Sequence, residues 1–241
     1  TMSTVPHAPS YYAASANAAP ARPPLEGAIE TDICIVGAGY TGLSSAIALA
    51  EAGFKVVLLD QSKVGWGASG RNGGQIVHSY SRDIDFIEGF YGKEKAKPLG
   101  DMMLEGALVI RERIAKYNIA CDLKNGGIYA ATSHKKTKQL HEHKELWEKW
   151  GNKDLTMIED KAQIKQYINT DRYAGLLIDK SGGHIHPLNL ALGEAAAVEQ
   201  LGGTIYEDCA VTRIERGAKP VVHTANGKVT AKFVIVACNA Y

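Results

Sequence analysis

Three glycines form the first group of residues whose spacing indicates chemistry. Gly37, Gly39 and Gly42 follow a short apolar run, residues 32–36, and precede a run of helix-forming residues. Glycines at this spacing permit a tight turn, close approach of the main chain to a diphosphate, and close packing of a helix on a strand. At the start of a helix, free main-chain N–H groups and the positive end of the helix dipole attract phosphate. The pattern therefore predicts a dinucleotide-binding turn.

An acidic residue completes this pattern. Asp60 ends the next apolar run, 18 residues after Gly42 (60 − 42). A carboxylate near this spacing accepts hydrogen bonds from the ribose hydroxyls of a bound dinucleotide. An ordinary solvated acid at a strand end is the alternative. Because strand, glycines, helix and acid occur in the expected order, the ribose-binding role is favoured.

FAD and NAD share this fingerprint, and a glycine-rich stretch further along the chain distinguishes between them. Residues 65–75 read GWGASGRNGGQ. Its glycines allow the main chain to lie against a large flat ligand, and its polar side chains offer hydrogen bonds to phosphate and ring oxygens. An NAD-binding domain would continue from its second strand into another helix, and a flexible surface loop is the remaining alternative. The stretch favours FAD.

The residues expected to contact FAD come from three segments. They are Gly37, Ala38, Gly39, Tyr40, Thr41 and Gly42 in the first turn, Asp60 and Gln61 after the second strand, and Gly67, Ala68, Ser69, Gly70, Arg71, Asn72, Gly73, Gly74 and Gln75 in the glycine-rich stretch.

No catalytic residue is identified by its type and spacing. Arg71 is a candidate for tuning the flavin, because a buried guanidinium near the ring would stabilise negative charge on reduced FAD. Pairing of Arg71 with a carboxylate is the competing interpretation. His184 and His186 are two apart and could bind a metal, but no third ligand accompanies them, so a packing or hydrogen-bonding role is favoured.

The elements that must position these residues begin with a strand, helix and strand. Residues 32–36 and 55–60 are expected to be buried parallel strands, and residues 41–52 the helix between them, ended by Gly53 in a left-handed conformation. Further helices are expected at 99–117, 135–150 and 184–201, and further strands at 126–131, 204–206, 211–215, 221–224 and 229–236. Asn226-Gly227 predicts a type I′ hairpin turn before the last of these strands.

Composition limits the possible functions. The formal charge is only +1, from 27 basic and 26 acidic residues, so nucleic-acid binding is not expected. No run is long and apolar enough for a spanning helix, and no signal peptide is evident. The four cysteines are scattered, which favours a reduced, cytoplasmic compartment. Residues 1–29, rich in Ala, Pro and Ser, are expected to be an extended or disordered arm, whose Tyr11 and Tyr12 could dock elsewhere.

Several motifs together resemble a known family. GAGYTGLSSAIALAEAGF, GASGRNGGQ, SGGHIHPLNLA and VIVACNAY are similar to segments of the FAD-dependent amino acid and amine oxidases of the D-amino acid oxidase (DAO) group. The narrower motifs are SYYAASAN at 10–17, HSYSRDID at 78–85 and RYAGLLIDKSGGHIHP at 172–187. The resemblance covers nearly the whole chain.

The resemblance implies an α/β fold class. An FAD-binding Rossmann-like domain of the glutathione-reductase type would comprise residues 30–90 and 185–241, discontinuous and incomplete. Residues 91–184 would form part of an α+β substrate domain. Val211 would hold the adenine by main-chain contacts. Because chains of the family are about twice as long, the missing C-terminal half is expected as a second polypeptide or a continuation.

The resemblance also implies an activity. We expect FAD-dependent oxidation of an amine, gamma-glutamylputrescine, to gamma-glutamyl-aminobutyraldehyde, with O2 as electron acceptor and release of H2O2, in putrescine catabolism. An apolar pocket that lowers the pKa of the substrate amine could suffice without a dedicated base. Two alternatives remain open: a dehydrogenase that passes electrons to a quinone or carrier protein, and an FAD-binding subunit without turnover.

Overall fold

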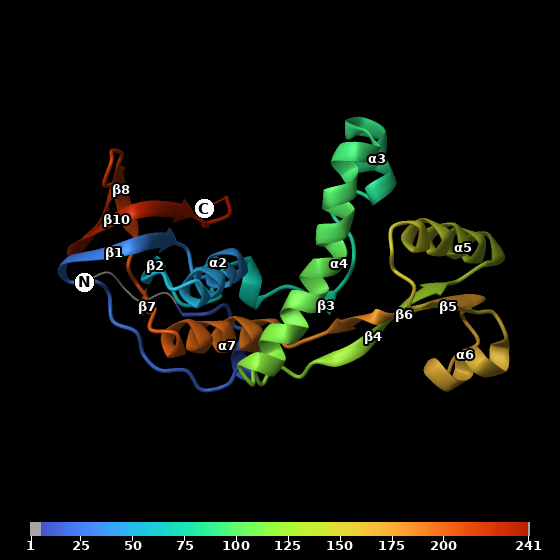
Figure 1. Ribbon diagram of the computed structural model, residues 1–241. Helices are drawn as coiled ribbons and strands as arrows, with labels where there is room; N and C mark the ends of the chain where they lie inside the picture. Colours follow the sequence, from blue (N-terminus) through green and yellow to red (C-terminus); the bar gives the residue numbers. More distant parts are fainter. Residues whose placement is uncertain (1–5, 241) are drawn as a thin grey trace. The chain divides into compact units, whose positions relative to one another are not determined.

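The computed structural model describes residues 6–240, which divide into two compact units (Figure 1). The first unit holds residues 6–73, 114–121 and 186–240, and the second holds 74–113 and 122–185. The sequence-based division has other bounds, since 74–90 and 185 fall in the second unit and 114–121 in the first.

The first unit is built on a six-stranded sheet of order β7-β2-β1-β10-β9-β8. The first four strands in this order are parallel to one another, β9 pairs antiparallel with β10, and β8 pairs antiparallel with β9. The parallel pair β1 and β2 agrees with the strand, helix and strand predicted from the glycine fingerprint. The strands are β1 (Gly27–Val36), β2 (Val56–Leu59), β7 (Thr204–Tyr206), β8 (Val211–Glu215), β9 (Val221–Thr224) and β10 (Gly227–Val236).

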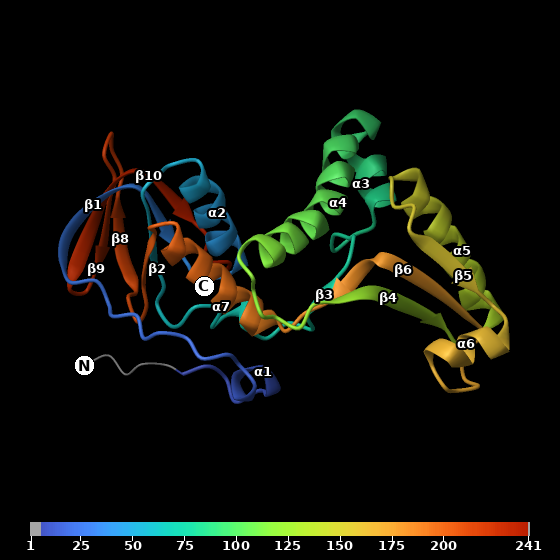
Figure 2. The ribbon, with the colours of Figure 1, turned by 60° about the horizontal axis from the view of Figure 1, so that its bottom comes forward.

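Two helices cover one face of this sheet, α2 (Tyr40–Glu51) and α7 (Pro187–Gln200) (Figures 1 and 2). Their small apolar residues pack on the alternate residues of β1 and β2 that face them, such as Ile35 and Leu58, which are fully buried. The intervening residues, such as Cys34, face a second cluster on the opposite side of the sheet. Burial on both faces explains why residues 33–36 of β1 and all of β2 are continuous apolar runs rather than alternating ones.

The end of α2 follows the prediction for Gly53. Gly53 has a φ of +90°, which an L side chain rarely adopts. The main-chain N–H groups of Gly53 and Phe54 donate to the carbonyls of Ala50 and Leu49, at 2.9 and 3.0 Å. These bonds satisfy carbonyls at the helix end and turn the chain into β2.

The N-terminal arm is extended and docked on the first unit rather than disordered over its described residues. It contains one short helix, α1 (Tyr11–Ala14). The Tyr12 ring packs edge-on against His186 with centroids 5.2 Å apart, and the Asn17 N–H donates to the Asn189 Oδ1 at 2.8 Å. Residues 1–5 of the expected arm lie outside the described residues.

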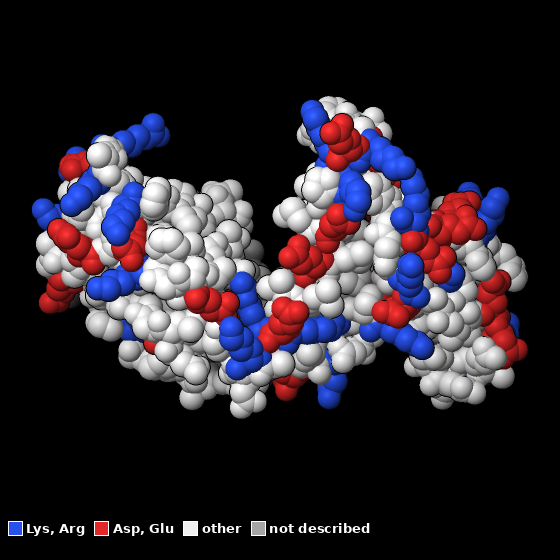
Figure 3. All heavy atoms as spheres, in the orientation of Figure 1, with Lys and Arg blue, Asp and Glu red and all other residues white. Residues whose placement is uncertain are grey.

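The second unit is a separate antiparallel sheet of order β3-β6-β4, with β5 also paired to β6. Its strands are β3 (Gln75–Ile76), β4 (Lys124–Ala131), β5 (Leu155–Ile158) and β6 (Gly175–His184). Its helices are α3 (Ile84–Tyr91), α5 (His134–Lys149), α6 (Lys161–Tyr167) and α4 (Lys93–Lys116), whose last residues belong to the first unit. Leu177 of β6 is buried against Trp147 and Leu140 of α5. On the face shown in Figure 3, basic and acidic side chains are interspersed over the surface.

The hairpin between β9 and β10 is present, but its predicted type I′ turn is wrong. Such a turn needs positive φ at both central residues, and neither Asn226 nor Gly227 has one. Gly227 instead begins β10, where a Cβ would lie 2.7 Å from the carbonyl oxygen of Gly27. The glycine permits close approach of β10 to β1 rather than a turn.

The described residues include no helix long and apolar enough to cross a bilayer. 

Replacing Gly42 with alanine tests the packing of α2 on β1. A Cβ at Gly42 would lie 1.9 Å from the carbonyl oxygen of Gly37. Because main-chain atoms on both sides must move, we expect Gly42→Ala to destabilise the protein by about 2 kcal/mol or more. Thermal unfolding followed by circular dichroism measures the effect.

Gly106→Ala is the matched control, because Gly106 lies exposed within α4 and its Cβ would meet no atom within 4 Å. This variant should gain about 0.5–1 kcal/mol from the higher helix propensity of alanine. Equal thermal midpoints for the two variants would contradict the packing account.

Candidate active site

A cavity of about 710 Å³ lies at the carboxyl ends of three parallel strands in the first unit. Val36, Leu59 and Val236, the last residues of β1, β2 and β10, all line it. Ligands of open α/β sheets bind at this edge, and the volume is within the range of small-molecule and cofactor sites, about 300–1,000 Å³. The fold therefore places a cofactor-sized hollow where the sequence predicts the dinucleotide.

Ten of the predicted contact residues line this cavity. They are Gly37, Gly39, Tyr40, Thr41, Asp60, Gln61, Gly67, Ala68, Ser69 and Val211.

The turn before α2 presents main-chain donors to the cavity. Gly37 has a φ of +107°, and a Cβ there would lie 2.5 Å from the carbonyl oxygen of Ala237. Gly39 is the N-cap residue of α2 and supplies no side-chain cap. The Tyr40 N–H donates to Ser69 Oγ at 2.9 Å, whereas the N–H groups of Gly39 and Thr41 have no hydrogen-bond acceptor among residues 6–240. These donors at a helix N-terminus suit an anionic ligand.

Two predicted residues of this turn stabilise it without facing the cavity. Ala38 is fully buried, and its N–H donates to Asp60 Oδ2 at 2.7 Å. Gly42 is needed for the contact between α2 and β1. They hold the turn without lining the cavity.

Asp60 is held by the main chain at the edge of the cavity. Its Oδ1 accepts from the Ser62 N–H at 2.8 Å, and its Oδ2 accepts from Ala38. Burial raises the pKa of the Asp60 carboxyl, and the negative charges of Glu207 and Asp208 add to this, while the two main-chain N–H groups act in the opposite direction. Each carboxylate oxygen has a further lone pair, so Asp60 can accept additional hydrogen bonds from a ligand.

The glycine-rich stretch divides between the two units. Gly67, Ala68 and Ser69 line the cavity, and Ala68–Gly70 form a 3₁₀ turn. Gly70 is structural, because a Cβ would lie 2.2 Å from the carbonyl oxygen of Gly65. Arg71, Asn72 and Gly73 lie outside the cavity lining, and Gly74 and Gln75 belong to the second unit.

Arg71 differs from both interpretations offered for it. Its side chain is exposed, and the guanidinium lies over the Trp66 ring, 4.7 Å from the centroid. Its Nε donates to the Gly67 carbonyl oxygen at 3.1 Å. Among the described residues, no carboxylate forms an ion pair with it. Stacking on an aromatic ring keeps a guanidinium hydrated on its other face, which explains the exposure.

Residues that sequence reasoning missed form much of the cavity wall, and most of them are apolar. Trp66, Ile214 and residues 236–239 line it together with the strand ends. The Ala237 N–H donates to the Val36 carbonyl oxygen at 2.8 Å, which extends the β1–β10 pairing into the cavity. The convergence of parallel strand ends could have identified them, but only if the β1–β10 pairing had been known.

His186 has a structural role in place of metal binding. It is buried, and its Nδ1 accepts from the Asn189 N–H at 3.1 Å, so it caps α7. Its Nε2 lies 3.1 Å from Ser15 Oγ. His184 is exposed and lies in the second unit.

Residues 32–241 match the family model described as DAO, FAD dependent oxidoreductase. The chain belongs to the FAD dependent oxidoreductase family. FAD is the cofactor of this family, and the cavity fits it, because unpartnered amides and a carboxylate occupy one part and apolar side chains another. This confirms the fold class and the cofactor predicted from the sequence.

Curated relatives agree with this family. Over 98% of the chain, 56% of residues are identical to gamma-glutamylputrescine oxidoreductase of Escherichia coli. Identity is 40%, also over 98% of the chain, to the probable oxidoreductase OrdL of Haemophilus influenzae. The chain covers 55% of each of these proteins, and so spans about half the length of the curated relatives it matches.

Solved structures of similar fold support the architecture. An L-amino acid deaminase from Proteus myxofaciens matches with a TM-score of 0.73 at 23% identity, covering 89% of this chain and 47% of that one. A glycine oxidase from Geobacillus kaustophilus matches with a TM-score of 0.68 at 23% identity, covering 87% and 55%. At these identities the likeness concerns the fold.

Thiol labelling tests which ligand fills the cavity. Cys238 lines it and is half-buried, whereas Cys34, Cys121 and Cys209 are buried, and burial raises the pKa of Cys34 to about 12. Since the thiolate is the reactive form, we expect an alkylating reagent to modify Cys238 first in the apoprotein. FAD should slow that modification, as measured by mass spectrometry of the labelled peptides. An equal rate with and without FAD would place the cofactor elsewhere.

Proposed function

We propose that the cavity of the first unit holds FAD. The N–H groups of Gly39 and Thr41 would bind the diphosphate, Asp60 the ribose hydroxyls, and the main chain at Val211 the adenine. The observation that carries this proposal is the pair of unpartnered amides beside a cofactor-sized cavity at the strand ends. FAD, when bound, supplies the capacity to accept a hydride from the carbon next to a nitrogen. The chain's own residues bind and orient the cofactor.

We further propose that the substrate is gamma-glutamylputrescine, in the pathway that degrades putrescine. The 56% identity to the Escherichia coli gamma-glutamylputrescine oxidoreductase supports this choice. The C–N bond of the substrate would be oxidised to an imine, which water hydrolyses to gamma-glutamyl-aminobutyraldehyde and ammonia. The two electrons would reduce O2 to H2O2. We place the reaction in the cytoplasm, in keeping with four cysteines that are free thiols.

A single assay separates this activity from its alternatives. Purified holoenzyme is given gamma-glutamylputrescine, and aldehyde, oxygen uptake and peroxide are followed together. The proposal predicts one peroxide per aldehyde. Reduction of a redox dye without peroxide would point to a quinone or a carrier protein as acceptor. Bound FAD with no turnover on any amine would leave a cofactor-binding subunit, and turnover of glycine or D-amino acids alone would remove the substrate assignment.

Alanine at Gly39 tests whether phosphate approaches the main chain there. A Cβ at Gly39 would meet one atom closely, Ser69 Oγ at 2.9 Å, and the φ of −88° is ordinary for alanine. If the site holds a diphosphate, Gly39→Ala should raise the Kd for FAD by about tenfold or more. Fluorescence titration of the apoprotein with FAD measures this Kd.

Adding Ser69→Ala to Gly39→Ala tests whether position 39 must be glycine because of Ser69 or because of bound phosphate. The double variant Gly39→Ala/Ser69→Ala removes the internal clash but not a clash with bound phosphate. We therefore expect the double variant to bind FAD as weakly as Gly39→Ala. Recovery of wild-type affinity in the double variant would show that the glycine serves only to accommodate Ser69.

Asp60 gives FAD affinity a dependence on pH. The ribose hydroxyls would donate to its carboxylate, and the raised pKa means that the apoprotein takes up a proton at a higher pH than an ordinary aspartic acid does. Affinity should be constant above this pKa and fall by about tenfold per pH unit below it, since one proton competes with the ligand.

Two variants identify the titrating group. Asp60→Asn should bind FAD at least about tenfold more weakly at neutral pH, because a charged acceptor is lost, and its acid limb should be absent. His7 also lies near Asp60, and burial lowers its pKa, so it could titrate in the same range. His7→Gln should keep the acid limb. An unchanged acid limb in Asp60→Asn would contradict the ribose-binding role.

A further inference from the structure

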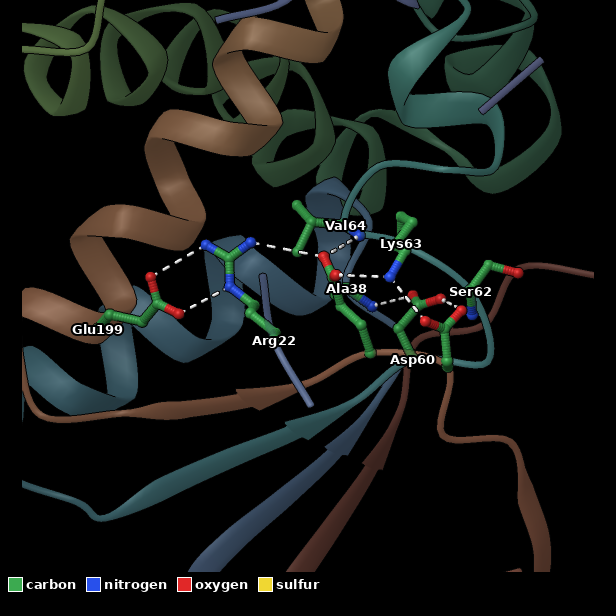
Figure 4. Close-up of polar contacts among 9 residues, drawn as sticks. Arg22, Ala38, Asp60, Ser62, Lys63, Val64 and Glu199 are labelled. Atoms are coloured by element: carbon green, nitrogen blue, oxygen red, sulfur yellow. Dashed lines mark hydrogen bonds and ion pairs between the residues drawn. The ribbon is translucent and has the colours of Figure 1, made fainter. Parts of the chain in front are cut away.

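A buried cation connects the N-terminal arm with the first unit. Arg22 is 6% exposed. Its Nε and Nη2 donate to the two carboxylate oxygens of Glu199 on α7, at 2.7 and 3.0 Å, and its Nη1 lies 3.4 Å from Glu207 Oε1 (Figure 4). A bidentate bond of this type fixes the plane of the guanidinium, so its third nitrogen has a defined direction toward Glu207.

Glu207 connects Arg22 to the segment after β2. It is buried, and the oxygen that Arg22 approaches also accepts from the Val64 N–H at 3.0 Å. Its other oxygen lies 3.4 Å from Lys63 Nζ, which forms a 2.6 Å bond with Asp208. One carboxylate therefore holds both the main chain and a side chain of residues 63–64.

That segment is bonded to the dinucleotide-binding turn. The Gly65 N–H donates to the Ala38 carbonyl oxygen at 3.0 Å. The Ala38 N–H donates to Asp60, which also accepts from the Ser62 N–H. Trp66 and Gly67, the next residues along the chain, line the cavity. A series of contacts thus runs from Arg22 through Glu207 and residues 64–65 to the main chain of Ala38. Figure 4 shows the contacts of Arg22 and Val64 and those of Ala38 with Asp60, but not the Gly65 bond that joins them.

The charges in this cluster make Arg22 its main buried cation. Three carboxylates, those of Asp60, Glu207 and Asp208, lie close enough that Glu207 and Asp208 act on the ionisation of Asp60. Lys63 is 29% exposed at its side chain, so solvent screens it, whereas the Arg22 side chain is 4% exposed. Removing one partner from a buried pair leaves the other charge uncompensated. Without Arg22, the charged Glu207 carboxylate would be more stable turned toward water. It would then no longer accept the hydrogen bond from the Val64 N–H.

We propose that Arg22 is a positioning residue of the cofactor site, acting through Glu207 to hold residues 62–65 against the Gly37–Gly39 turn. The inference rests on the proposed FAD site. The N-terminal arm is then a part of the machinery that binds FAD, although none of residues 6–29 lines the cavity. A purely structural role, in which Arg22 only anchors the arm, predicts a loss of stability without a change in the cofactor site.

Three variants separate these roles. Arg22→Met keeps the length of the side chain but loses its charge, and Arg22→Lys keeps the charge without the fixed fork. Asn17→Ala is the control, because it removes the 2.7 Å bond by which the Asn17 side chain anchors the same arm to the Ala120 carbonyl oxygen, and Asn17 makes no bond to residues 62–65. The Kd for FAD is measured by titration of apoprotein, well below the thermal midpoint of each variant, and the midpoints are recorded without FAD.

The expected result is a change in affinity that stability does not explain. Arg22→Met should raise the Kd for FAD by about tenfold, Arg22→Lys should be intermediate, and Asn17→Ala should stay within about twofold of wild type. A lower thermal midpoint for Arg22→Met with a Kd within twofold of wild type would overturn the inference.

The dependence on Glu207 is tested in a double variant. Glu207→Gln removes the charge that Arg22 compensates and leaves a carbonyl oxygen for the Val64 N–H. If Arg22 acts through Glu207, adding Arg22→Met to Glu207→Gln should change the Kd by less than about threefold. An undiminished tenfold change would show that Arg22 acts by another route. Failure of wild-type protein to bind FAD would overturn the proposed function itself, and this outcome is distinct from both.

Discussion

The site depends on the contact between the amino end of α2 and the carboxyl end of β1. Gly42 allows the helix to approach the turn at Gly37, which leaves the first amides of α2 directed at the cavity. Helix N-termini have unsatisfied N–H groups in any protein, but most are capped by a side chain. Here the N-cap residue is Gly39, which has no side chain, and Ser69 satisfies only Tyr40. The remaining donors are available to a ligand.

Burying the Asp60 carboxylate after β2 costs free energy, and its surroundings partly offset that cost. Burial near Glu207 and Asp208 raises the pKa of Asp60, so its charged form is less stable than in water. The Ala38 and Ser62 N–H groups reduce that cost and at the same time orient the carboxylate. Arg22 and Lys63 balance the neighbouring acids, so an arm far along the sequence from the β2 end is joined electrostatically to it. Cofactor binding and folding of the arm are therefore linked in this account.

The sequence predicted the first unit well because its signals are local. The glycine turn, α2, Gly53 and the two buried strands lie within about thirty residues, and each has a steric reason readable from residue types. The contacts that sequence reasoning missed are those between distant segments. The Arg22 ion pairs with Glu199 and Glu207 and the Ser15–His186 contact join residues 171 to 185 positions apart. The bond of the Ala237 N–H to Val36 joins residues 201 positions apart (237 − 36). The central strand β6 was missed because its apolar run, Leu176–Ile178, is short and is followed by polar residues and glycines.

The most direct measurement is a crystal structure of the FAD-loaded protein. The account predicts diphosphate oxygens within hydrogen-bonding distance of the Gly39 and Thr41 N–H groups, with the ribose hydroxyls on Asp60. A diphosphate bound away from this turn, or protein side chains filling the cavity in the loaded protein, would contradict it.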